Sequence, residues 1–442
     1  MVRGSGRDRR LCVSINGQRV AVWSVVHGKH RIDYESSWIE GTGSRPLSLS
    51  LPLTPHGGSH VGPRVEYWFE NLLPDDPAMR ERMRLRFGAR SSSTIDLLAE
   101  VGRDCVGSVQ LHDPGVEPAF PEPATGKPLD EAGVATRLRD ASRGSLPGIR
   151  GGDEFRMSLA GAQEKTALTR IDGAWHLPAG ATPTTHILKL PLGRVAMRGV
   201  DLSTSVANEH FCMRLLAALG LDVADTVVER FEDITTLVVK RFDRRLAGDG
   251  RTLLRLPQED FCQALGFSRE AKYETDGGPG IEQCLAMLSG SRRAAEDRRA
   301  FFTTQIVLWL LAAVDGHAKN FSLFIEHDGR FTLTPRYDVL SVWPHVGTPE
   351  LPRQRAAFAM GWHGKNRHYK LAEIRPEHLL ASARRCAMWR EMPSIVEHLA
   401  TTMPDAIEHV LLETRNDVPA DLSGSVVDGA TAALAALVES LS

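Results

Sequence analysis

The feature that most constrains this chain is an apolar run that ends abruptly in an acid. Residues Ile306–Val314 are all apolar, and Asp315 follows directly. Asn320 comes five residues later, before a second apolar segment over Phe321–Ile325. Burying a carboxylate at the end of such a run is costly unless another group pairs with it. The pattern therefore predicts a polar loop held between two buried supports.

An aspartate and an asparagine at this separation suit a kinase catalytic loop, in which the acid aligns a hydroxyl and the amide holds magnesium. A second acid, Asp338, follows a short strand-like segment in LTPRYDV, residues 333–339. An aspartate after a helix is more often a cap or turn residue. On Asp315, Asn320 and Asp338 alone this ordinary role is favoured, so the rest of the chain has to decide.

Composition narrows the class of protein. With 53 basic and 55 acidic residues, the chain has no overall field that would draw it to nucleic acid. Local basic clusters, such as Arg241–Arg245, are expected to be solvated faces. The six cysteines have no CxxC spacing, which favours buried thiols over a disulfide framework or a zinc site. Apolar runs stop at about nine residues, too short to cross a bilayer, so we expect a cytoplasmic protein without a membrane segment.

The 442 residues predict two to three domains. The first third reads as a small α+β unit, and a proline-rich stretch follows it. The chain then changes from a β-containing half to a mostly helical half. The predicted boundaries are 1–112 for an N-terminal subdomain, 113–153 for a linker or surface excursion, 154–243 for a β-containing domain and 244–442 for a helical domain.

Local patterns predict several individual elements. Asn16-Gly17 between alternating apolar halves predicts a hairpin over Leu11–Ser24, and Arg45–Leu53 predicts an edge strand. Further strands are expected over Thr185–Leu190 and Asp233–Phe242, and a helix over Val206–Leu219. Later helices are expected over Asp260–Leu265, Ile281–Leu288, Arg292–Val314, Pro376–Trp389, Pro393–Thr402, Ala406–Thr414 and Gly429–Leu441.

Two features before residue 210 suit phosphate binding. Gly161 interrupts a strand–turn–strand pattern, and backbone amides in such a turn can bind phosphate. Lys189 lies within an apolar strand and needs an anionic partner. Glu209 lies in the first turn of the next helix, as in the lysine–glutamate pair of kinases. An ordinary hairpin turn and a solvated glutamate remain the alternatives.

Taken together, the motifs carry a family resemblance. The chain is similar to the HipA family, the serine/threonine-kinase toxins of HipBA toxin–antitoxin systems, over roughly Val13–Met403. The motifs occur in the family's order and are MSLAGAQEKTAL, TPTTHILKLP, VKRFDRR, RLPQEDFCQALG, YETDGGPGI, DGHAKNFS and LTPRYD, with RPLSLSLPL, NLLPDDP and LLAEVGRDCVGSV in the first third.

The resemblance implies an α+β, two-lobed protein-kinase-like fold. Its N-terminal lobe would be β-rich with an added N-terminal subdomain, and its C-terminal lobe all-helical. Asp315 would be the catalytic base, Asn320 and Asp338 would hold Mg²⁺, and Lys189 would contact the ATP phosphates. The further ATP-binding residues implied are the phosphate loop Ala160, Gly161, Ala162, Gln163, Glu164 and Lys165, the hinge Lys240, Arg241 and Phe242, and His317, Lys319 and Tyr337.

The resemblance also implies regulation and partners. Ser158 matches the family's autophosphorylation site, and a phosphoryl group there would repel nucleotide, so self-inactivation is expected. The implied protein substrate is an aminoacyl-tRNA synthetase, glutamyl-tRNA synthetase in particular, whose inhibition would arrest growth. The implied partner is a HipB-like helix-turn-helix antitoxin dimer, with operator DNA bound mainly through that antitoxin.

Two other functions stay open at this point. The same fold could phosphorylate a small molecule or a lipid. Alternatively, the chain could act mainly as a transcriptional corepressor with the antitoxin. Asp315, Asn320 and Asp338 together argue against a purely binding role, because a chain without catalysis needs none of the three.

Overall fold

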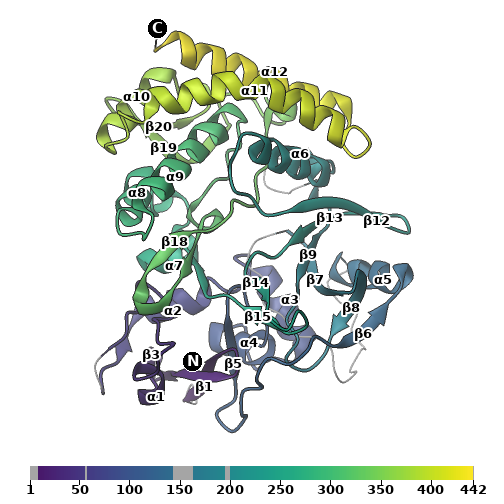
Figure 1. The fold of residues 1–442 in the computed structure, drawn as a ribbon, viewed down its shortest axis with the longest axis vertical. Helices are drawn as coiled ribbons and strands as arrows, with labels where there is room; N and C mark the ends of the chain where they lie inside the picture. The colour runs from purple at the N-terminus through teal and green to yellow at the C-terminus, as the bar shows by residue number, and fades with distance from the viewer. Residues whose placement is uncertain (1–7, 55–56, 143–162, 195–199, 442) are drawn as a thin grey trace, which may run out of the picture. The chain divides into compact units, whose positions relative to one another are not determined.

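The fold is described from a computed structural model, over residues 8–54, 57–142, 163–194 and 200–441. The chain forms two compact units, and each unit is assembled from three separate stretches of sequence. Unit 1 contains residues 1–188, 241–270 and 323–331, and unit 2 contains residues 189–240, 271–322 and 332–442 (Figure 1).

Unit 1 begins with a five-stranded antiparallel sheet in the order β4-β3-β2-β1-β5. Its strands are β1 (Arg9–Ile15), β2 (Gln18–Val26), β3 (Lys29–Tyr34), β4 (His60–Val61) and β5 (Val109–His112). Asn16 and Gly17 join β1 to β2 with φ values of 46° and 82°, which a tight hairpin turn requires. The predicted hairpin is confirmed.

Four helices accompany this sheet, namely α1 (Ser36–Ile39), α2 (Pro63–Glu70), α3 (Pro77–Phe87) and α4 (Thr94–Val101). Trp23 of β2 stacks on Phe69 of α2 with ring centroids 3.8 Å apart, inside the buried core of the unit. The strand predicted over Arg45–Leu53 is wrong, because this segment forms only an isolated bridge between Ser48 and Leu51. Its prolines cannot donate to a strand ladder.

A second group of strands in unit 1 has the order β9-β7-β8-β6. The bounds are β6 (Gly126–Leu129), β7 (Lys165–Ile171), β8 (Ala174–Pro178) and β9 (His186–Lys189). Helix α5 (Glu131–Ser142) packs on β6 and β7. The stretch 113–153, expected as a linker or surface excursion, therefore contains a strand and a helix within its described part.

The later stretches of unit 1 add short elements. These are β14 (Arg244–Leu246), β15 (Leu253–Arg255), β16 (Gln258–Asp260) and α7 (Phe261–Leu265), together with most of β17 (Ser322–Ile325). Helix α7 begins with a capping box in which Asp260 and Gln263 satisfy each other's backbone amides.

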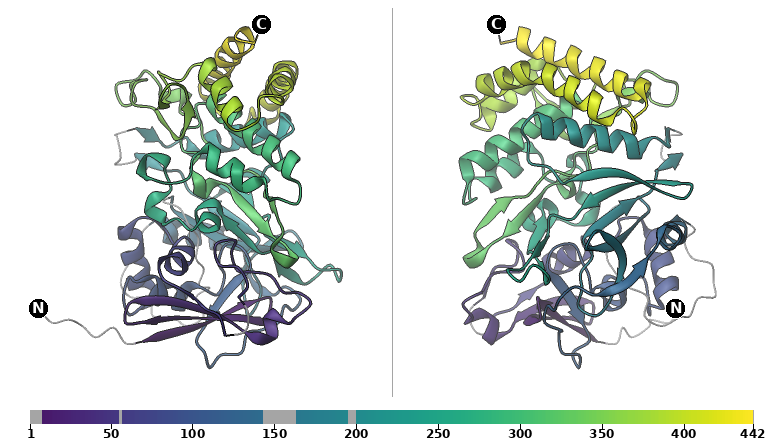
Figure 2. Two further views of the ribbon diagram at one scale, coloured as in Figure 1. Left: turned by 90° about the vertical axis from the view of Figure 1, so that its left-hand side faces the viewer. Right: turned by 45° about the vertical axis from the view of Figure 1, so that its right-hand side comes forward.

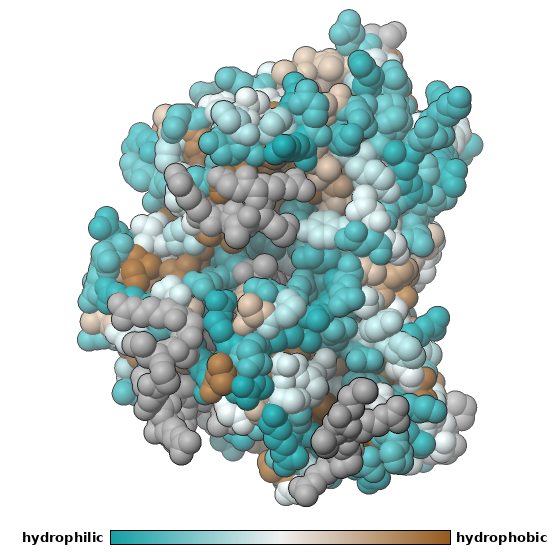
Figure 3. All heavy atoms as spheres, turned by 180° about the vertical axis from the view of Figure 1, so that it is seen from behind, coloured by the Kyte–Doolittle hydropathy of each residue, from teal (hydrophilic) through white to brown (hydrophobic). Residues whose placement is uncertain are grey.

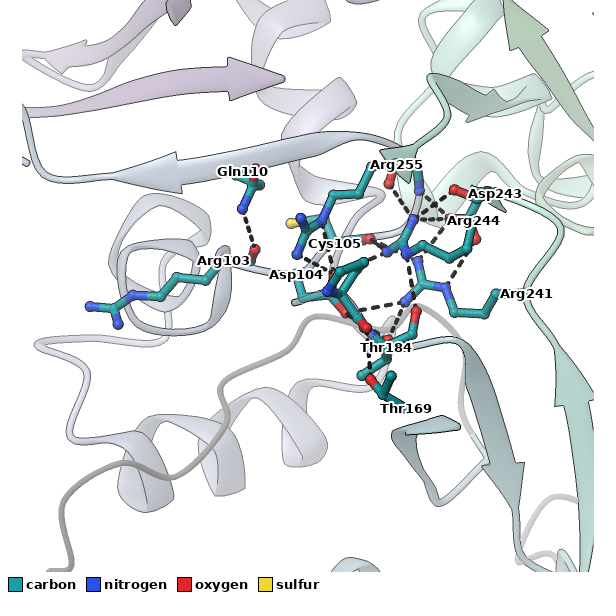
Figure 4. Close-up of polar contacts among 12 residues, drawn as sticks. Arg103, Asp104, Cys105, Gln110, Thr169, Thr184, Arg241, Asp243, Arg244 and Arg255 are labelled. Atoms are coloured by element: carbon teal, nitrogen blue, oxygen red, sulfur yellow. Dashed lines mark hydrogen bonds and ion pairs between the residues drawn. The ribbon is translucent and has the colours of Figure 1, made fainter. Parts of the chain in front are cut away.

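A cluster of buried charges joins the early and late stretches of unit 1 (Figure 4). Asp104, just after α4, is fully buried, and its carboxylate accepts hydrogen bonds from Thr184, Arg244 and Arg255 at 2.6, 3.0 and 3.1 Å. Arg241 donates to both oxygens of Asp243 at 3.0 and 2.7 Å. The expectation that Arg241–Arg245 is a solvated face is wrong, since Arg241 and Arg244 are buried counter-ions.

Unit 2 begins with two antiparallel pairs and one buried helix. The elements are β10 (Gly193–Arg194), β11 (Asp201–Leu202), α6 (Ser205–Ala218), β12 (Thr226–Phe231) and β13 (Ile234–Lys240). Helix α6 packs against β12 and β13. Helix α6 and strand β13 lie within one or two residues of the predicted bounds, because their apolar patterns are long and regular.

The rest of unit 2 is dominated by α8 (Ile281–Leu288), α9 (Ala294–Leu310), α10 (Pro376–Arg385), α11 (Met392–Thr414) and α12 (Ala420–Glu439). Helices α11 and α12 lie side by side (Figures 1 and 2). The two helices predicted over Pro393–Thr402 and Ala406–Thr414 form one, with Pro404 inside it. The contacts of α11 with α6 and α12 hold both halves despite the hydrogen bond that a proline removes.

The region 244–442 is not all-helical as expected. Besides the strands assigned to unit 1, it contains β18 (Phe331–Leu333) and the hairpin β19 (Ala357–His363) and β20 (Arg367–Lys370), on which α10 packs. Helix α12 is long and apolar enough to cross a membrane by length and composition alone. A third of its most apolar window is buried (33%), including Val426 and Leu437, and the helix packs on α9 and α11.

The six cysteines all lie in the described part of the chain, are buried as the sequence predicts, and form no disulfide there. On the face seen in Figure 3, hydrophilic side chains predominate and hydrophobic ones occur in small separate patches. Such scattered apolar groups are normal on a water-facing surface.

Candidate active site

The predicted polar loop lies directly after α9, inside unit 2. The helix ends at Leu310, and Ala312 takes a left-handed φ of 46°, which turns the chain out of the helix. The backbone amide of Ala359 on β19 donates to the carbonyl of Val314 at 2.9 Å. A Cβ on Gly316 would lie 2.5 Å from the Leu308 side chain, so a larger residue there would require Leu308 to shift. Asp315 is thus presented on a rigid support.

Asn320 closes the loop onto Asp315. It ends a 3₁₀ turn over Ala318–Asn320, and its side-chain amide donates to the backbone carbonyl of Asp315 at 2.9 Å. This bond fixes the amide group and leaves its oxygen as the atom that can bind a cation. The spacing in the sequence predicts only that Asp315 and Asn320 lie on one loop, and this hydrogen bond joins the two residues directly.

Lys189 gathers two acids from distant parts of the chain. Its ammonium group lies 2.7 Å from a carboxylate oxygen of Glu209 on α6 and 2.7 Å from Oδ1 of Asp338. Burial alone would lower the pKa of Lys189, but Asp338 and Glu209 outweigh it and raise the pKa above its ordinary value. The lysine is therefore a permanent cation that draws Asp338 and α6 together.

Asp338 is held in an unusual backbone conformation. Its φ of 62° lies in the left-handed region, which a non-glycine residue adopts only when the surroundings enforce it. The hydroxyl of the preceding Tyr337 donates to the Lys319 carbonyl at 2.9 Å and lies 2.6 Å from the Ser322 hydroxyl. These contacts tie the Asp338 segment to the Asp315 loop.

Residues of the Asp315 loop and of the Asp338 segment line one pocket. Asp315, Gly316, Asn320, Tyr337 and Asp338 all line it. Asn320 and Asp338 supply an amide oxygen and a carboxylate, the donor set with which Mg²⁺ is usually held when phosphate oxygens complete its shell. Among the described residues, no group of three His, Cys, Asp or Glu side chains lies close enough to hold a metal ion.

The other predicted residues of the loop are buried. His317 is 6% exposed, and burial lowers the pKa of its imidazole, so this ring is neutral at pH 7. Its Nε2 lies 4.0 Å from Oδ2 of Asp315. Lys319 is 8% exposed within the same turn. Both side chains are therefore largely shielded from solvent.

The structure describes only some of the remaining residues predicted to bind ATP. Ser158 and Ala160, Gly161 and Ala162 of the phosphate loop lie outside the described residues. Gln163 is buried and Glu164 half-buried, and Lys165 begins β7, all in unit 1. In unit 2, Lys240 is exposed, and its ammonium lies 3.8 Å from the Asp225 carboxylate. Arg241 belongs to the buried ion cluster of unit 1. The ring of Phe242 packs edge to face on the ring of Phe324, with centroids 5.9 Å apart.

Two residues near the site had no role assigned from the sequence. Asn208 makes a pair of 2.8 Å hydrogen bonds with the backbone of Ser341, three residues after Asp338. The Tyr273 hydroxyl donates to Oδ1 of Asp315 at 2.7 Å. The motif YETDGGPGI marked the second residue, but nothing in its spacing pointed to the loop at Asp315.

Comparison with known proteins agrees with this architecture. The 36% identical putative kinase Y4mE of Sinorhizobium fredii matches over 334 residues, 75% of this chain and 76% of that protein. The serine/threonine-protein kinase toxin HipA of Shewanella oneidensis is 29% identical over 322 residues, 70% of each chain.

A solved structure supports the same fold. The chain is similar to the Shewanella oneidensis MR-1 toxin–antitoxin complex of HipA, HipB and operator DNA, with a TM-score of 0.77, 23% identity and 97% of each chain covered. The α+β kinase-like fold is therefore confirmed. The family described as HipA N-terminal domain matches residues 11–112, and the HipA-like C-terminal domain matches residues 157–407. This chain belongs to the HipA family.

Proposed function

We propose that the chain is a Mg²⁺- and ATP-dependent serine/threonine protein kinase that acts as the toxin of a toxin–antitoxin pair. The observation that carries the proposal is the pairing of Lys189 with both Glu209 and Asp338 at 2.7 Å, beside a pocket that Asp338 shares with Asp315 and Asn320. A lysine, a helix-borne glutamate, a base and two magnesium ligands are the parts that phosphoryl transfer requires.

Each residue then has a defined role. Lys189 neutralises phosphate charge, and Glu209 keeps its ammonium directed into the site. Asn320 and Asp338 would hold Mg²⁺, which supplies further neutralisation of the phosphate oxygens when bound. Asp315 aligns the hydroxyl of the acceptor and accepts its proton. Positioning and charge compensation carry most of the catalysis in such a site.

The reaction balances without any other reactant. The acceptor oxygen forms a bond to the γ-phosphorus of ATP, the bond from that phosphorus to the bridging oxygen of ADP breaks, and the hydroxyl proton passes to Asp315. The proposed phosphate loop Ala160–Lys165 covers the phosphates, and backbone groups of Lys240–Phe242 contact adenine. Phosphorylation of Ser158 would inactivate the enzyme by placing negative charge beside bound nucleotide.

The biological role rests on the relatives. The related structure contains HipB and operator DNA, which supports a HipB-like antitoxin dimer that neutralises this chain and links it to operator DNA. The proposed substrate is an aminoacyl-tRNA synthetase, glutamyl-tRNA synthetase in particular, so the kinase inhibits translation and promotes growth arrest and persistence. The six buried thiols are consistent with a cytoplasmic location.

The proposal is tested by replacing the base and the metal ligand separately. The variants Asp315→Asn and Asp338→Asn each remove one charge at constant shape. Both are expected to abolish transfer of label from [γ-³²P]ATP to glutamyl-tRNA synthetase and to the chain itself, and to relieve growth arrest on expression. Retained labelling in both variants would contradict the assignment. Labelling of small molecules or lipids, with none of protein, would favour the alternative substrate class.

A further inference from the structure

The segment that carries Tyr273 reaches the proposed base from outside the catalytic loop. Tyr273 immediately precedes a 3₁₀ turn over Glu274–Asp276 in unit 2. Its phenolic hydroxyl donates to Oδ1 of Asp315 at 2.7 Å, and its ring meets the His317 ring edge to face at 5.3 Å. One tyrosine thus contacts two residues of the loop.

The backbone around Tyr273 is fixed on both sides. The amide of Ala318, in the catalytic loop, donates to the carbonyl of Lys272 at 3.3 Å. On the other side, the Glu274 carboxylate is nearly buried, accepts from the Gly361 amide on β19 at 2.6 Å and pairs with Arg367. The contacts of Lys272 and Glu274 therefore fix the position of Tyr273, in addition to the hydrogen bond of its own hydroxyl.

A tight turn after Tyr273 removes the remaining freedom. The amides of Asp276 and Gly278 both donate to the Tyr273 carbonyl at 3.0 Å. A Cβ on Gly278 would lie 1.9 Å from the carbonyl oxygen of Ala271, so only glycine fits there. Gly277, with a φ of 88°, and Gly278 therefore serve to close this turn after the tyrosine.

The fixed tyrosine decides which way the base faces. The Asp315 side chain is 64% exposed, and an exposed carboxylate without a partner rotates among several rotamers. A hydrogen bond from Tyr273 to Oδ1 restrains that rotation. Oδ2, which lies toward His317, is then the oxygen left for the hydroxyl of the acceptor.

We propose that Tyr273 is a positioning residue of the transfer site, which holds the Asp315 carboxylate so that Oδ2 receives the acceptor proton. This inference rests on the proposed function, because it gives Asp315 the role of base. Because the Tyr273 hydroxyl donates to the proposed base, its effect should fall on the transfer step and not on binding of ATP.

The test uses the full-length chain with Tyr273→Phe, which removes the hydroxyl and keeps the ring against His317. Label transfer from [γ-³²P]ATP to the chain itself and to glutamyl-tRNA synthetase is measured under single-turnover conditions. We expect transfer about tenfold slower than in the wild type, equivalent to ~1.4 kcal/mol of barrier. ATP affinity and the thermal midpoint should stay unchanged. Tyr67→Phe on α2 of unit 1 is the matched control and should leave all three quantities unchanged.

Two outcomes would overturn the inference. Wild-type or faster transfer in Tyr273→Phe would show that the hydroxyl does not assist the base. Weakened ATP binding together with a lowered thermal midpoint would show a merely structural role. A crystal structure of the variant gives an answer independent of activity, since Asp315 should occupy more than one rotamer, and a single unchanged rotamer would contradict the proposal.

The Asp315→Asn variant separates this inference from the proposed function. If Asp315→Asn abolishes transfer while Tyr273→Phe behaves as the wild type, only the role of the tyrosine fails. If Asp315→Asn retains transfer, the proposed function itself fails. The double variant should transfer no more slowly than Asp315→Asn alone, because the tyrosine acts through that carboxylate.

Discussion

Replacing Asp104 by asparagine should destabilise unit 1 severely. The side chain is fully buried, and three arginines and Thr184 point at its two oxygens. Burial alone would raise the pKa of Asp104, but Arg244, Arg255 and Arg241 hold it well below its ordinary value, so the carboxylate is charged at any working pH. Asparagine keeps the volume but removes the charge, and it turns an NH₂ group toward a donor.

The expected cost follows from the charges left behind. Removing one partner of a buried ion pair typically costs about 3–5 kcal/mol, because the other charge stays buried without compensation. Asp243 still compensates Arg241, with contacts of 3.0 and 2.7 Å, and it lies 3.0 Å from Arg244, so the loss falls mainly on Arg255. A domain is usually stable by only about 5–15 kcal/mol, so Asp104→Asn should remove a large part of the total.

The assay is urea unfolding, since urea does not screen charge, with hydrogen exchange of the peptides around residues 104 and 184 as a local readout. Glu117→Gln is the control, because Glu117 pairs with Arg19 at 2.8 Å but is 84% exposed, and such surface pairs contribute ~0–1 kcal/mol. Adding Arg255→Met to Asp104→Asn should recover stability by removing an unpaired cation. Equal costs for Asp104→Asn and Glu117→Gln, or strictly additive effects in the double variant, would refute this reasoning.

Three further variants test other parts of the structure. Glu209→Gln should raise the KM for ATP and slow transfer, because Lys189 loses a counter-ion. The control Glu413→Gln, which removes one charge from a surface ion pair with α6, should change neither quantity. Steady-state kinetics measure both. Burial raises the pKa of Glu259 to about 8, so the folded state keeps a proton that the unfolded chain loses above pH 4.5. Unfolding free energy should therefore fall as pH rises from 4.5 to 8, and Glu259→Gln should flatten that profile in thermal melts across this range. Gly278→Ala should lower the thermal midpoint and transfer together, since its Cβ would lie 1.9 Å from a carbonyl oxygen; an unchanged midpoint would contradict the turn described here.

The parts of the site that are local in sequence were predictable. The spacing of Asp315 and Asn320 after an apolar run is enough to suggest a loop, and the side-chain bond of Asn320 to the Asp315 carbonyl spans only five residues. Lys189 and Asp338, which form an ion pair, lie 149 residues apart in the sequence. Only the order of several motifs, and no single pattern, pointed to it.

Features that depend on tertiary contacts could not be predicted from the sequence. Arg241 and Arg244 look like a solvated basic run, because their partner Asp104 lies more than a hundred residues away. The hairpin β19–β20 was missed because β20 is only the four residues RHYK, which show no apolar alternation. Tyr273 was missed for a related reason, since a tyrosine in a glycine-rich turn shows its hydrogen-bond partner only in three dimensions.

The ion cluster of Figure 4 has a consequence for synthesis on the ribosome. Asp104 emerges 137 residues before Arg241 and 151 residues before Arg255. At ~5–20 residues per second, the carboxylate waits about 7–30 s for its cations to be translated. Until then the nascent N-terminal part carries a negative charge that it cannot bury, so its interior cannot close. Folding of unit 1 is therefore delayed until more than half of the polypeptide exists.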